Sequence, residues 1–170
     1  MSMPETAEIY LQPGEWKLVR EPAILKTVLG SCVGITFRAP RLGISAMCHP
    51  MLPCYAARPG ADPSRLVVGR YVDSVIEQIA NKFAGQDAQP GEIEVKLFGG
   101  ADVLASSRKN ATVGKMNGVT ALEVLERLGF RPVVSRLGGS QGVFIEFHTA
   151  TGEVLLRRLN NMDAVALART

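Results

Sequence analysis

The pattern of apolar and polar residues predicts strands over most of the first fifty residues. Short apolar or alternating runs bounded by Gly, Pro or Ser are typical of strands. They occupy residues 8–12, 16–19, 24–29, 33–38 and 44–49. Pro-Arg-Leu-Gly at residues 40–43 suits a hairpin connection between the last two. The Pro-rich stretch that follows, residues 50–63, is expected to form a long surface loop of the same domain.

A helical pattern replaces the strands after this loop. From Arg65 to Phe83, apolar residues recur at steps of three and four, after Asp-Pro-Ser and before a glycine, which predicts an amphipathic helix. Residues 92–98 then form a predicted strand that runs into two glycines. A second helix is expected from about Gly118 to Leu128, where the next glycine ends it.

The chain ends in further strands, with residues 149–152 as a hairpin turn between the last two. These strands are predicted over residues 133–135, 143–148 and 153–159. Strands therefore outnumber helices, which indicates an α+β layered sandwich. No internal repeat or low-complexity tract divides the sequence. Since 170 residues lie within the usual size of one domain, residues 1–170 are expected to form a single domain.

Composition and charge argue against several classes of protein. With 46% hydrophobic and 21% charged residues, the chain resembles a globular protein rather than a disordered or fibrous one. Its net charge of +3 is spread along the sequence and is too weak to indicate nucleic-acid binding. No apolar run approaches the ~20 residues that span a bilayer, and the first residues lack a secretion signal. The protein is expected to be cytoplasmic and not membrane-inserted.

Three cysteines, Cys32, Cys48 and Cys54, form an odd set without an export signal, so reduced thiols are expected. Cys32 follows Gly30 and Ser31 between two predicted strands, where a turn can present a side chain at the edge of a sheet. Glycine allows backbone angles that other residues avoid. The exposed N–H groups of such a turn could receive a developing oxyanion.

His49 is the candidate general base for Cys32. An ordinary cysteine is only a few per cent thiolate at neutral pH, so a nucleophilic Cys32 needs an imidazole that accepts its proton. His49 ends a predicted strand 17 residues later, whereas the other histidine, His148, ends a remote strand. A small buried cysteine and a hydrogen-bonded histidine without any catalytic role are the alternative interpretation of the same residues.

A metal site and phosphate-binding loops are weaker alternatives. The three cysteines and His49 could supply four ligands, but in an extended strand Cys48 and His49 point to opposite faces, and the spacing is not that of a zinc finger. The Gly-rich segments 98–102 and 137–142 match neither the dinucleotide-binding nor the P-loop pattern, so tight turns at strand ends are expected there. No metal or cofactor is expected.

Six short motifs follow one another along residues 24–159. They are Thr27-Val-Leu-Gly-Ser-Cys32, Met47-Cys-His-Pro-Met-Leu-Pro53, Lys96-Leu-Phe-Gly-Gly-Ala101, Gly114-Lys-Met-Asn117, Gly138-Gly139 and Thr151-Gly-Glu-Val154. Each is modest alone, but in this order and spacing they strongly resemble the CheD family of chemoreceptor glutamine deamidases. The resemblance covers most of the chain.

The resemblance implies a three-layer α/β/β sandwich with mixed sheets, related to cysteine-dependent deamidase toxins. It implies hydrolysis of selected glutamine side chains of methyl-accepting chemotaxis receptors to glutamate, with release of ammonia. Carried over by position, Cys32 is the nucleophile, His49 the base and Thr27 a third active-site residue. It also implies, in some bacteria, a CheC-type phosphatase as a partner.

Thr27 and Cys32 can share a site only if the strand between them is interrupted. They are five residues apart, and in a continuous strand this odd separation places two side chains on opposite faces. Gly30 and Ser31 are the place where a turn or bulge could re-aim the following side chain.

The motifs depart from the family pattern at two places. An acidic residue before the second Gly-Gly pair and a Gly-Arg after it are expected, whereas this chain has Arg136-Leu137 and Gly142-Val143. These departures bear on docking of substrate or partner more than on the Cys-His chemistry. A non-catalytic adaptor that binds receptors or the phosphatase is the alternative function. An enzyme is expected to have a depressed pKa at Cys32, whereas an adaptor's Cys32 would react no faster than the other thiols.

Overall fold

Two mixed β-sheets and two helices make up the computed structural model, which describes residues 5–56, 59–103 and 112–160. The four-stranded sheet has the order β1 (Ala7–Tyr10), β3 (Ala23–Leu29), β8 (Val143–His148) and β9 (Val154–Arg158). The five-stranded sheet has the order β2 (Trp16–Val19), β5 (Ile44–Cys48), β4 (Val33–Ala39), β6 (Glu94–Gly99) and β7 (Pro132–Leu137). The helices are α1 (Val72–Ala84) and α2 (Val113–Arg127). In each sheet one strand pair is parallel, β1 with β3 and β6 with β7.

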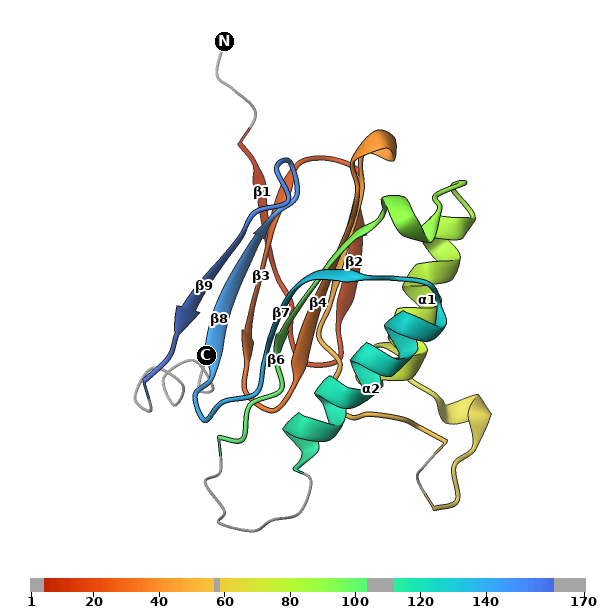
Figure 1. The fold of residues 1–170 in the computed structure, drawn as a ribbon, viewed down its shortest axis with the longest axis vertical. Helices are drawn as coiled ribbons and strands as arrows, with labels where there is room; N and C mark the ends of the chain where they lie inside the picture. Colours follow the sequence, from red (N-terminus) through yellow and green to blue (C-terminus); the bar gives the residue numbers. More distant parts are fainter. Residues whose placement is uncertain (1–4, 57–58, 104–111, 161–170) are drawn as a thin grey trace.

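These elements stack in three layers (Figure 1). Both helices cover one face of the five-stranded sheet, and the four-stranded sheet packs against its other face. One apolar core lies between the helices and the five-stranded sheet and includes Phe37, Ile76 and Leu125. A second core lies between the two sheets and includes Leu25 and Phe147. The predicted α+β fold, a three-layer α/β/β sandwich, is confirmed.

The burial of each strand follows from its layer. β3 buries every second residue, among them Thr27, and leaves the residues between partly exposed, as expected of a strand in an outer layer. β4 and β5 lie in the middle layer and are buried along almost their whole length. In β5, Met47 enters the core between the sheets, while Cys48 enters the core under the helices. Adjacent residues of β5 therefore pack in different cores, one on each side of the sheet.

The helix predicted from Arg65 starts seven residues later, at Val72, so its first part was predicted wrongly. The apolar period does continue back through this segment, but the backbone there forms two 3₁₀ turns. Tyr71 then takes an extended conformation and forms a β-bridge with Leu52. Because an extended residue interrupts helical hydrogen bonding, the regular helix can begin only after Tyr71.

The second helix begins five residues before its predicted start, at Val113. Thr112 caps it, because the Thr112 hydroxyl oxygen accepts a hydrogen bond of 3.2 Å from the N–H of Lys115. The first turns contain Gly114 and Gly118, and glycine is a poor helix former. The low helix propensity of these glycines is therefore the reason why the sequence did not predict the start of α2.

The predicted strand boundaries lie within two residues of those in the structure. Both predicted hairpins are confirmed, since β4 pairs antiparallel with β5 and β8 pairs antiparallel with β9. The loop predicted over residues 50–63 holds a single β-bridge residue and the start of a 3₁₀ turn in its described part. Residues 57–58 of this loop lie outside the described residues.

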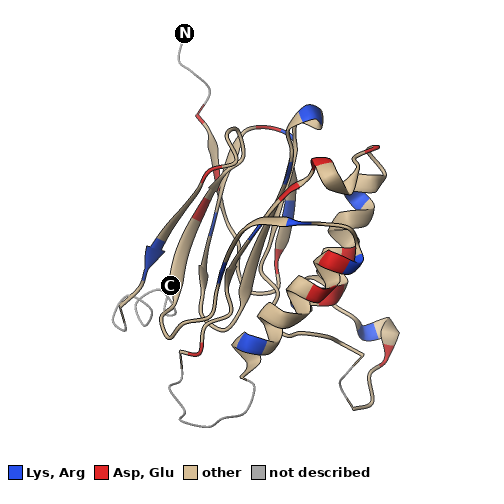
Figure 2. Ribbon diagram, viewed as in Figure 1, with Lys and Arg blue, Asp and Glu red and all other residues tan. Residues whose placement is uncertain are grey.

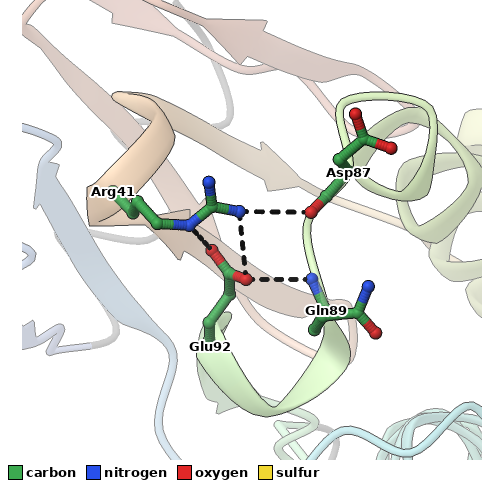
Figure 3. Close-up of polar contacts among 4 residues, drawn as sticks. All are labelled: Arg41, Asp87, Gln89 and Glu92. Atoms are coloured by element: carbon green, nitrogen blue, oxygen red, sulfur yellow. Dashed lines mark hydrogen bonds and ion pairs between the residues drawn. The ribbon is translucent and has the colours of Figure 1, made fainter.

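Arg41 fixes the hairpin between β4 and β5 to the loop that follows α1 (Figure 3). Its guanidinium donates to the Glu92 carboxylate at 2.9 and 3.2 Å and to the carbonyl of Asp87 at 3.1 Å. Glu92 also accepts a hydrogen bond of 3.1 Å from the N–H of Gln89. The hydrogen bond from Arg41 holds the pKa of Glu92 below its usual value. These contacts order the end of the sandwich opposite the Cys32 turn.

Charged residues are distributed over the outer surfaces in mixed signs (Figure 2). Between the helices, Arg127 pairs with Glu77 at 2.7 Å. On the outer face of the four-stranded sheet, Lys26 lies 2.8 Å from Glu8 and 3.3 Å from Glu146. No helix within the described ranges combines the length and the apolar character needed to cross a membrane.

Candidate active site

Cys32 lies where the chain passes from one sheet to the other. β3 of the four-stranded sheet ends at Leu29, and β4 of the five-stranded sheet begins at Val33. Gly30, Ser31 and Cys32 form the bend between them. The predicted break in the strand is therefore confirmed. At this break the chain also passes from the outer sheet to the middle sheet. Cys32 is partly buried and packs against the edge of the core between the sheets.

The turn is held by the segment that follows β6. Gly100 donates its N–H to the carbonyl of Cys32 at 2.8 Å, and Ala101 donates to the carbonyl of Gly30 at 2.9 Å. Gly99 has a φ of 94°, and a side-chain carbon there would overlap the carbonyl oxygen of Cys32. Glycine at position 99 is therefore required both by the backbone angle and by the close approach.

Gly30 does not have the special backbone that the sequence suggested. Its φ lies outside the left-handed region, and an added Cβ would meet only the side chain of Val103, at 3.5 Å, an ordinary contact. The prediction that glycine provides unusual angles at position 30 is therefore wrong. The bend gets its shape from the hydrogen bonds of its carbonyl groups to Gly100 and Ala101.

His49 follows β5 directly and is 2% exposed. Its backbone is fixed from both sides by the turn before β2. The N–H of His49 donates to the carbonyl of Glu15 at 3.0 Å, and its carbonyl accepts from Gly14 at 2.8 Å. These two bonds extend the pairing of β5 with β2, in which Cys48 lies opposite Trp16. The imidazole therefore projects from a rigid strand end.

Thr27 contacts the imidazole across the interface between the sheets. Thr27 Oγ1 lies 2.6 Å from His49 Nδ1 and donates to the carbonyl of Leu11 at 2.8 Å. A hydroxyl has a single proton, so with that proton used on Leu11 the oxygen must accept from Nδ1–H. The neutral ring then has an unprotonated Nε2. This tautomer is the one that can accept a proton from a thiol.

Burial keeps both candidate catalytic groups neutral near pH 7. It lowers the pKa of His49 to about 4, against the opposing effects of the Leu11 carbonyl and the Glu15 carboxylate. Burial also raises the pKa of Cys32 to about 11, and its own backbone N–H opposes this only in part. The expected depressed pKa of Cys32 is therefore contradicted, because burial outweighs the hydrogen bond from its own backbone N–H.

Strand pairing brings the Cys32 and His49 segments side by side. Cys32 directly precedes β4 and His49 directly follows β5, and the antiparallel register of these strands sets Ile35 against Cys48. The N–H of Val33 donates to the carbonyl of Pro50 at 3.4 Å, which continues the register beyond the strand ends. Cys32, His49 and Thr27 thus come from three strand ends at one end of the sandwich.

Asn117 of α2 was not singled out as a site residue by the sequence. It is completely buried, and its Nδ2 donates to the carbonyls of Ser31 and Met51 at 2.9 and 3.0 Å. These carbonyls belong to the segments that carry Cys32 and His49. The available signal was its place in the Gly114-Lys-Met-Asn117 motif, directly before the predicted helix.

The other candidates lie outside this site. His148 pairs with Ile24, three residues from Thr27 along β3, and an odd separation along a strand places it on the outer face. There its Nε2 lies 3.6 Å from the Glu146 carboxylate. Because Thr27 faces the interior, His148 cannot replace His49 as the base of this site.

The three cysteines are reduced thiols, as the sequence predicted. Cys48 is buried under the helices, where burial raises its pKa, and Cys54 lies partly buried in the loop after β5. Cys48 and His49 do face opposite sides of the middle sheet, as predicted. Within residues 5–56, 59–103 and 112–160, no three or more His, Cys, Asp or Glu residues form a group that could hold a metal ion.

The two Gly-rich segments form turns at strand ends, as predicted. Gly138 donates its N–H to the carbonyl of Gly99 at 2.9 Å, and Asp102 donates to the carbonyl of Gly139 at 2.8 Å. The departures at Arg136 and Val143 line a groove of about 810 Å³ between the edges of the sheets. This groove is lined by β6 to β9 and by the turn at residues 138–141, and contains neither Cys32 nor His49.

A partly exposed cysteine beside a buried neutral histidine is the kind of pair that cysteine hydrolases use. Comparison with known proteins shows that the chain belongs to the CheD family. The family model, described as CheD chemotactic sensory transduction, matches residues 51–158. This range begins two residues after His49, so the match does not itself cover Thr27, Cys32 or His49.

Whole-chain relatives extend the similarity over the site. The chain is 38% identical to "Probable chemoreceptor glutamine deamidase CheD 2" of Geobacter sulfurreducens over 161 residues, which are 95% of this chain and 96% of that protein. "Probable chemoreceptor glutamine deamidase CheD" of Oleidesulfovibrio alaskensis is 37% identical over 90% of this chain and 73% of that protein. The protein of the same name from Maridesulfovibrio salexigens is 35% identical over 89% and 91%.

One solved structure also has some similarity to the chain. The crystal structure of Bacillus licheniformis hypothetical protein YfiH matches 71% of this chain and 49% of that chain, with a TM-score of 0.45 and 8% identity. This similarity is too low to bear on the fold or on the site.

Proposed function

We propose that the chain is a protein-glutamine deamidase that converts selected glutamine side chains of methyl-accepting chemotaxis receptors to glutamate. Family membership and the names of the relatives support this activity. The observation that carries it is the contact between Thr27 and His49, 2.6 Å across the two sheets. This contact orients a neutral imidazole at the strand end beside the Cys32 turn.

Acylation uses Cys32 as nucleophile and His49 as base. Nε2 of His49 accepts the thiol proton while the sulfur of Cys32 attacks the carbon of the glutamine side-chain amide. The resulting imidazolium then gives that proton to the amide nitrogen, and ammonia leaves as the C–N bond breaks. The product is a thioester between Cys32 and the substrate side chain.

Hydrolysis of the thioester completes the cycle. A water molecule attacks the thioester carbon and transfers a proton to Nε2 of His49. The C–S bond breaks, the imidazolium returns the proton to the sulfur, and a glutamate side chain is released. Over the cycle one water is consumed and one ammonia is released, and Cys32 and His49 return to their neutral forms.

Thr27 is the positioning residue of this mechanism. Because its hydroxyl accepts from Nδ1–H, it selects the tautomer with an unprotonated Nε2. The resting pair is neutral, so the thiol loses its proton during the attack rather than before it. General base catalysis of this kind contributes ~10²–10⁴ in rate.

The turn at Gly30 and Ser31 is proposed to bind the oxyanion that forms during both attacks. The N–H of Cys32 lies against its own sulfur, where it acts to lower the thiol pKa. In the described part of the chain, the N–H groups of Ser31 and Cys32 donate no backbone hydrogen bond. Both are proposed to donate to the substrate oxygen in the transition state, and each such donor contributes ~10²–10³ in rate.

The proposal extends to the setting of the reaction. The substrate residues are expected on the cytoplasmic parts of receptors, so the protein is placed in the cytoplasm. A CheC-type phosphatase is the proposed regulatory partner, which follows from family resemblance. Both apolar cores share the five-stranded sheet, and this supports the proposal that residues 1–170 act as a single domain. Neither metal nor cofactor has a role in the mechanism.

The test is mass spectrometry of receptor cytoplasmic domains incubated with the purified protein. The wild-type chain is expected to convert specific glutamines to glutamates, whereas Cys32→Ala and His49→Ala are expected to form no product. Cys54→Ala is the control, since it removes a cysteine outside the site and is expected to retain activity. Product at the wild-type level from Cys32→Ala would overturn the assignment of the nucleophile. Tight receptor binding without product from the wild type would instead indicate an adaptor.

A further inference from the structure

One amide group links the backbone segments that carry the two catalytic residues. Asn117 is the fifth residue of α2 and is completely buried. Its Nδ2 donates to the carbonyl of Ser31 at 2.9 Å and to that of Met51 at 3.0 Å. Ser31 precedes Cys32, and Met51 lies two residues after His49. A third layer of the fold thus reaches the ends of β4 and β5.

The orientation of this amide is determined by its surroundings. An amide NH₂ has two protons, and here each one meets a carbonyl oxygen. The opposite orientation would place Oδ1 against the same two oxygens, with no proton between them. Both donors of Asn117 are therefore used to hold backbone atoms that lie 86 and 66 residues away in sequence.

The helix is shaped to bring Asn117 to these carbonyls. At Gly114, one turn before Asn117, an added Cβ would overlap the carbonyl oxygen of Ala101. At Gly118 an added Cβ would come within 3.4 Å of the Leu137 side chain. The absence of a side chain at Gly114 lets α2 approach the segment that follows β6, whereas the contact at Gly118 is an ordinary one with β7. That segment also holds the Cys32 turn through the N–H groups of Gly100 and Ala101.

The fold keeps Asn117 at a measurable cost. Its Oδ1 is buried and has no hydrogen-bond partner among the described residues. An unsatisfied buried acceptor destabilises a protein by about 1–3 kcal/mol, and asparagine is also a poor helix former. An apolar residue of similar shape would avoid both penalties, but it would leave the carbonyls of Ser31 and Met51 without this donor. Stability of α2 alone therefore does not account for this residue.

We propose that Asn117 is a positioning residue that fixes the distance between Cys32 and His49 by holding the carbonyls of Ser31 and Met51. The inference rests on the proposed function, because it assigns these residues to one reaction. Thr27 orients the imidazole, whereas Asn117 sets the spacing of the two backbone segments. Loss of the amide leaves the base and the nucleophile chemically unchanged but displaces them relative to each other. A displacement of about 1 Å can lower a rate ~10²-fold.

The primary test is the steady-state kinetics of Asn117→Leu, which keeps the approximate shape and removes the donors together with the unpaired acceptor. We expect kcat for deamidation to fall ~10²-fold. The KM is expected to stay within about twofold, since Asn117 does not face the substrate. A small fall in Tm is expected, because two carbonyls lose their amide donor while the unpaired acceptor is also removed. Val119→Leu, on the exposed face of the same helix, is the matched control and should leave kcat unchanged. Wild-type kcat in Asn117→Leu would overturn the proposal.

A double-mutant cycle separates positioning from a general effect on folding. The rate of Cys32 alkylation is measured in the wild type, Asn117→Leu, His49→Ala and the double variant. If Asn117 acts by placing His49, then His49→Ala lowers the rate strongly alone and little further in the Asn117→Leu background. Independent, multiplicative losses would overturn the proposal, even if Asn117→Leu were less stable.

The two proposals fail in different ways in this experiment. If deamidation needs neither His49 nor Asn117, the base assignment of the proposed function is wrong, and the positioning role is overturned with it. If deamidation needs His49 but proceeds normally in Asn117→Leu, only the positioning role is overturned. If Asn117→Leu does not fold, Asn117→Gln, which keeps the NH₂ group on a longer side chain, should retain more kcat than Asn117→Asp, which opposes a carboxylate to both carbonyls. The reverse order would overturn the role.

Discussion

His49 should make the stability of the fold depend on pH in a specific window. Its pKa is about 4 in the folded protein and 6.5 by default in an unfolded chain. Between these values the unfolded chain binds a proton that the folded protein does not bind. The stabilisation is therefore complete above pH 6.5 and is lost as the pH falls towards 4.

The size of the effect follows from the same two values. The gap between 6.5 and about 4 corresponds, at about 1.4 kcal/mol per pH unit, to about 3 kcal/mol in the free energy of unfolding. About 2 kcal/mol of this should already be lost at pH 5, because most unfolded molecules are protonated there. For a protein domain of ordinary stability, this is a substantial fraction of the total.

Urea unfolding at several pH values between 7 and 4 measures this contribution. His49→Gln removes the titrating group, so its free energy of unfolding should fall less steeply than that of the wild type, by about 3 kcal/mol over the whole range. His148→Gln is the control, because it removes a histidine from the outer face and leaves His49 in place. Carboxylates titrate in all three proteins and cancel in the comparison. Parallel curves for wild type and His49→Gln would refute a buried neutral His49.

Three further predictions concern the Cys32 turn and its neighbours. Because the pKa of Cys32 is raised to about 11, alkylation of the His49→Ala variant by iodoacetamide, which has only the thiolate route, should increase about tenfold per pH unit between pH 7 and 9, and a plateau in that range would contradict the raised pKa. Thr27→Val removes the acceptor for Nδ1–H of His49 and should lower kcat ~10²-fold, whereas Thr27→Ser should retain part of the activity. A kcat of Thr27→Val equal to that of the wild type would exclude a role for the hydroxyl. Gly99→Ala should lower the free energy of unfolding by more than about 1 kcal/mol relative to Gly30→Ala, and equal thermal stability would show that the turn adapts.

The sequence predicted the layers well because the signals for them are local. Alternating burial in β3 and the periodic apolar residues of α1 both follow from the nearest neighbours along the chain. The start of α1 was missed because Tyr71 pairs with Leu52, a contact between distant residues that no local pattern records. The start of α2 was missed because Gly114, in its first turn, allows close packing at the expense of helix propensity.

The sequence points to candidate site residues but not to their protonation states. The motifs indicated Cys32, His49 and Thr27, and the structure brings the Thr27 hydroxyl to the His49 ring. The direction of the pKa of Cys32 could not be predicted, since it depends on burial by residues from both sheets. Asn117 could not be assigned either, because its partners lie in two other segments of the chain.

The passage of the chain between sheets at Cys32 makes activity a measure of how completely the protein has folded. Thr27 belongs to one sheet, and His49 follows a strand of the other, so neither sheet alone contains an oriented His49 ring, the proposed base. A folding intermediate with only one sheet formed would retain its strands but could not deamidate a substrate. In a refolding experiment, recovery of deamidase activity should therefore follow the docking of the two sheets and not the earlier gain of β-structure seen by circular dichroism.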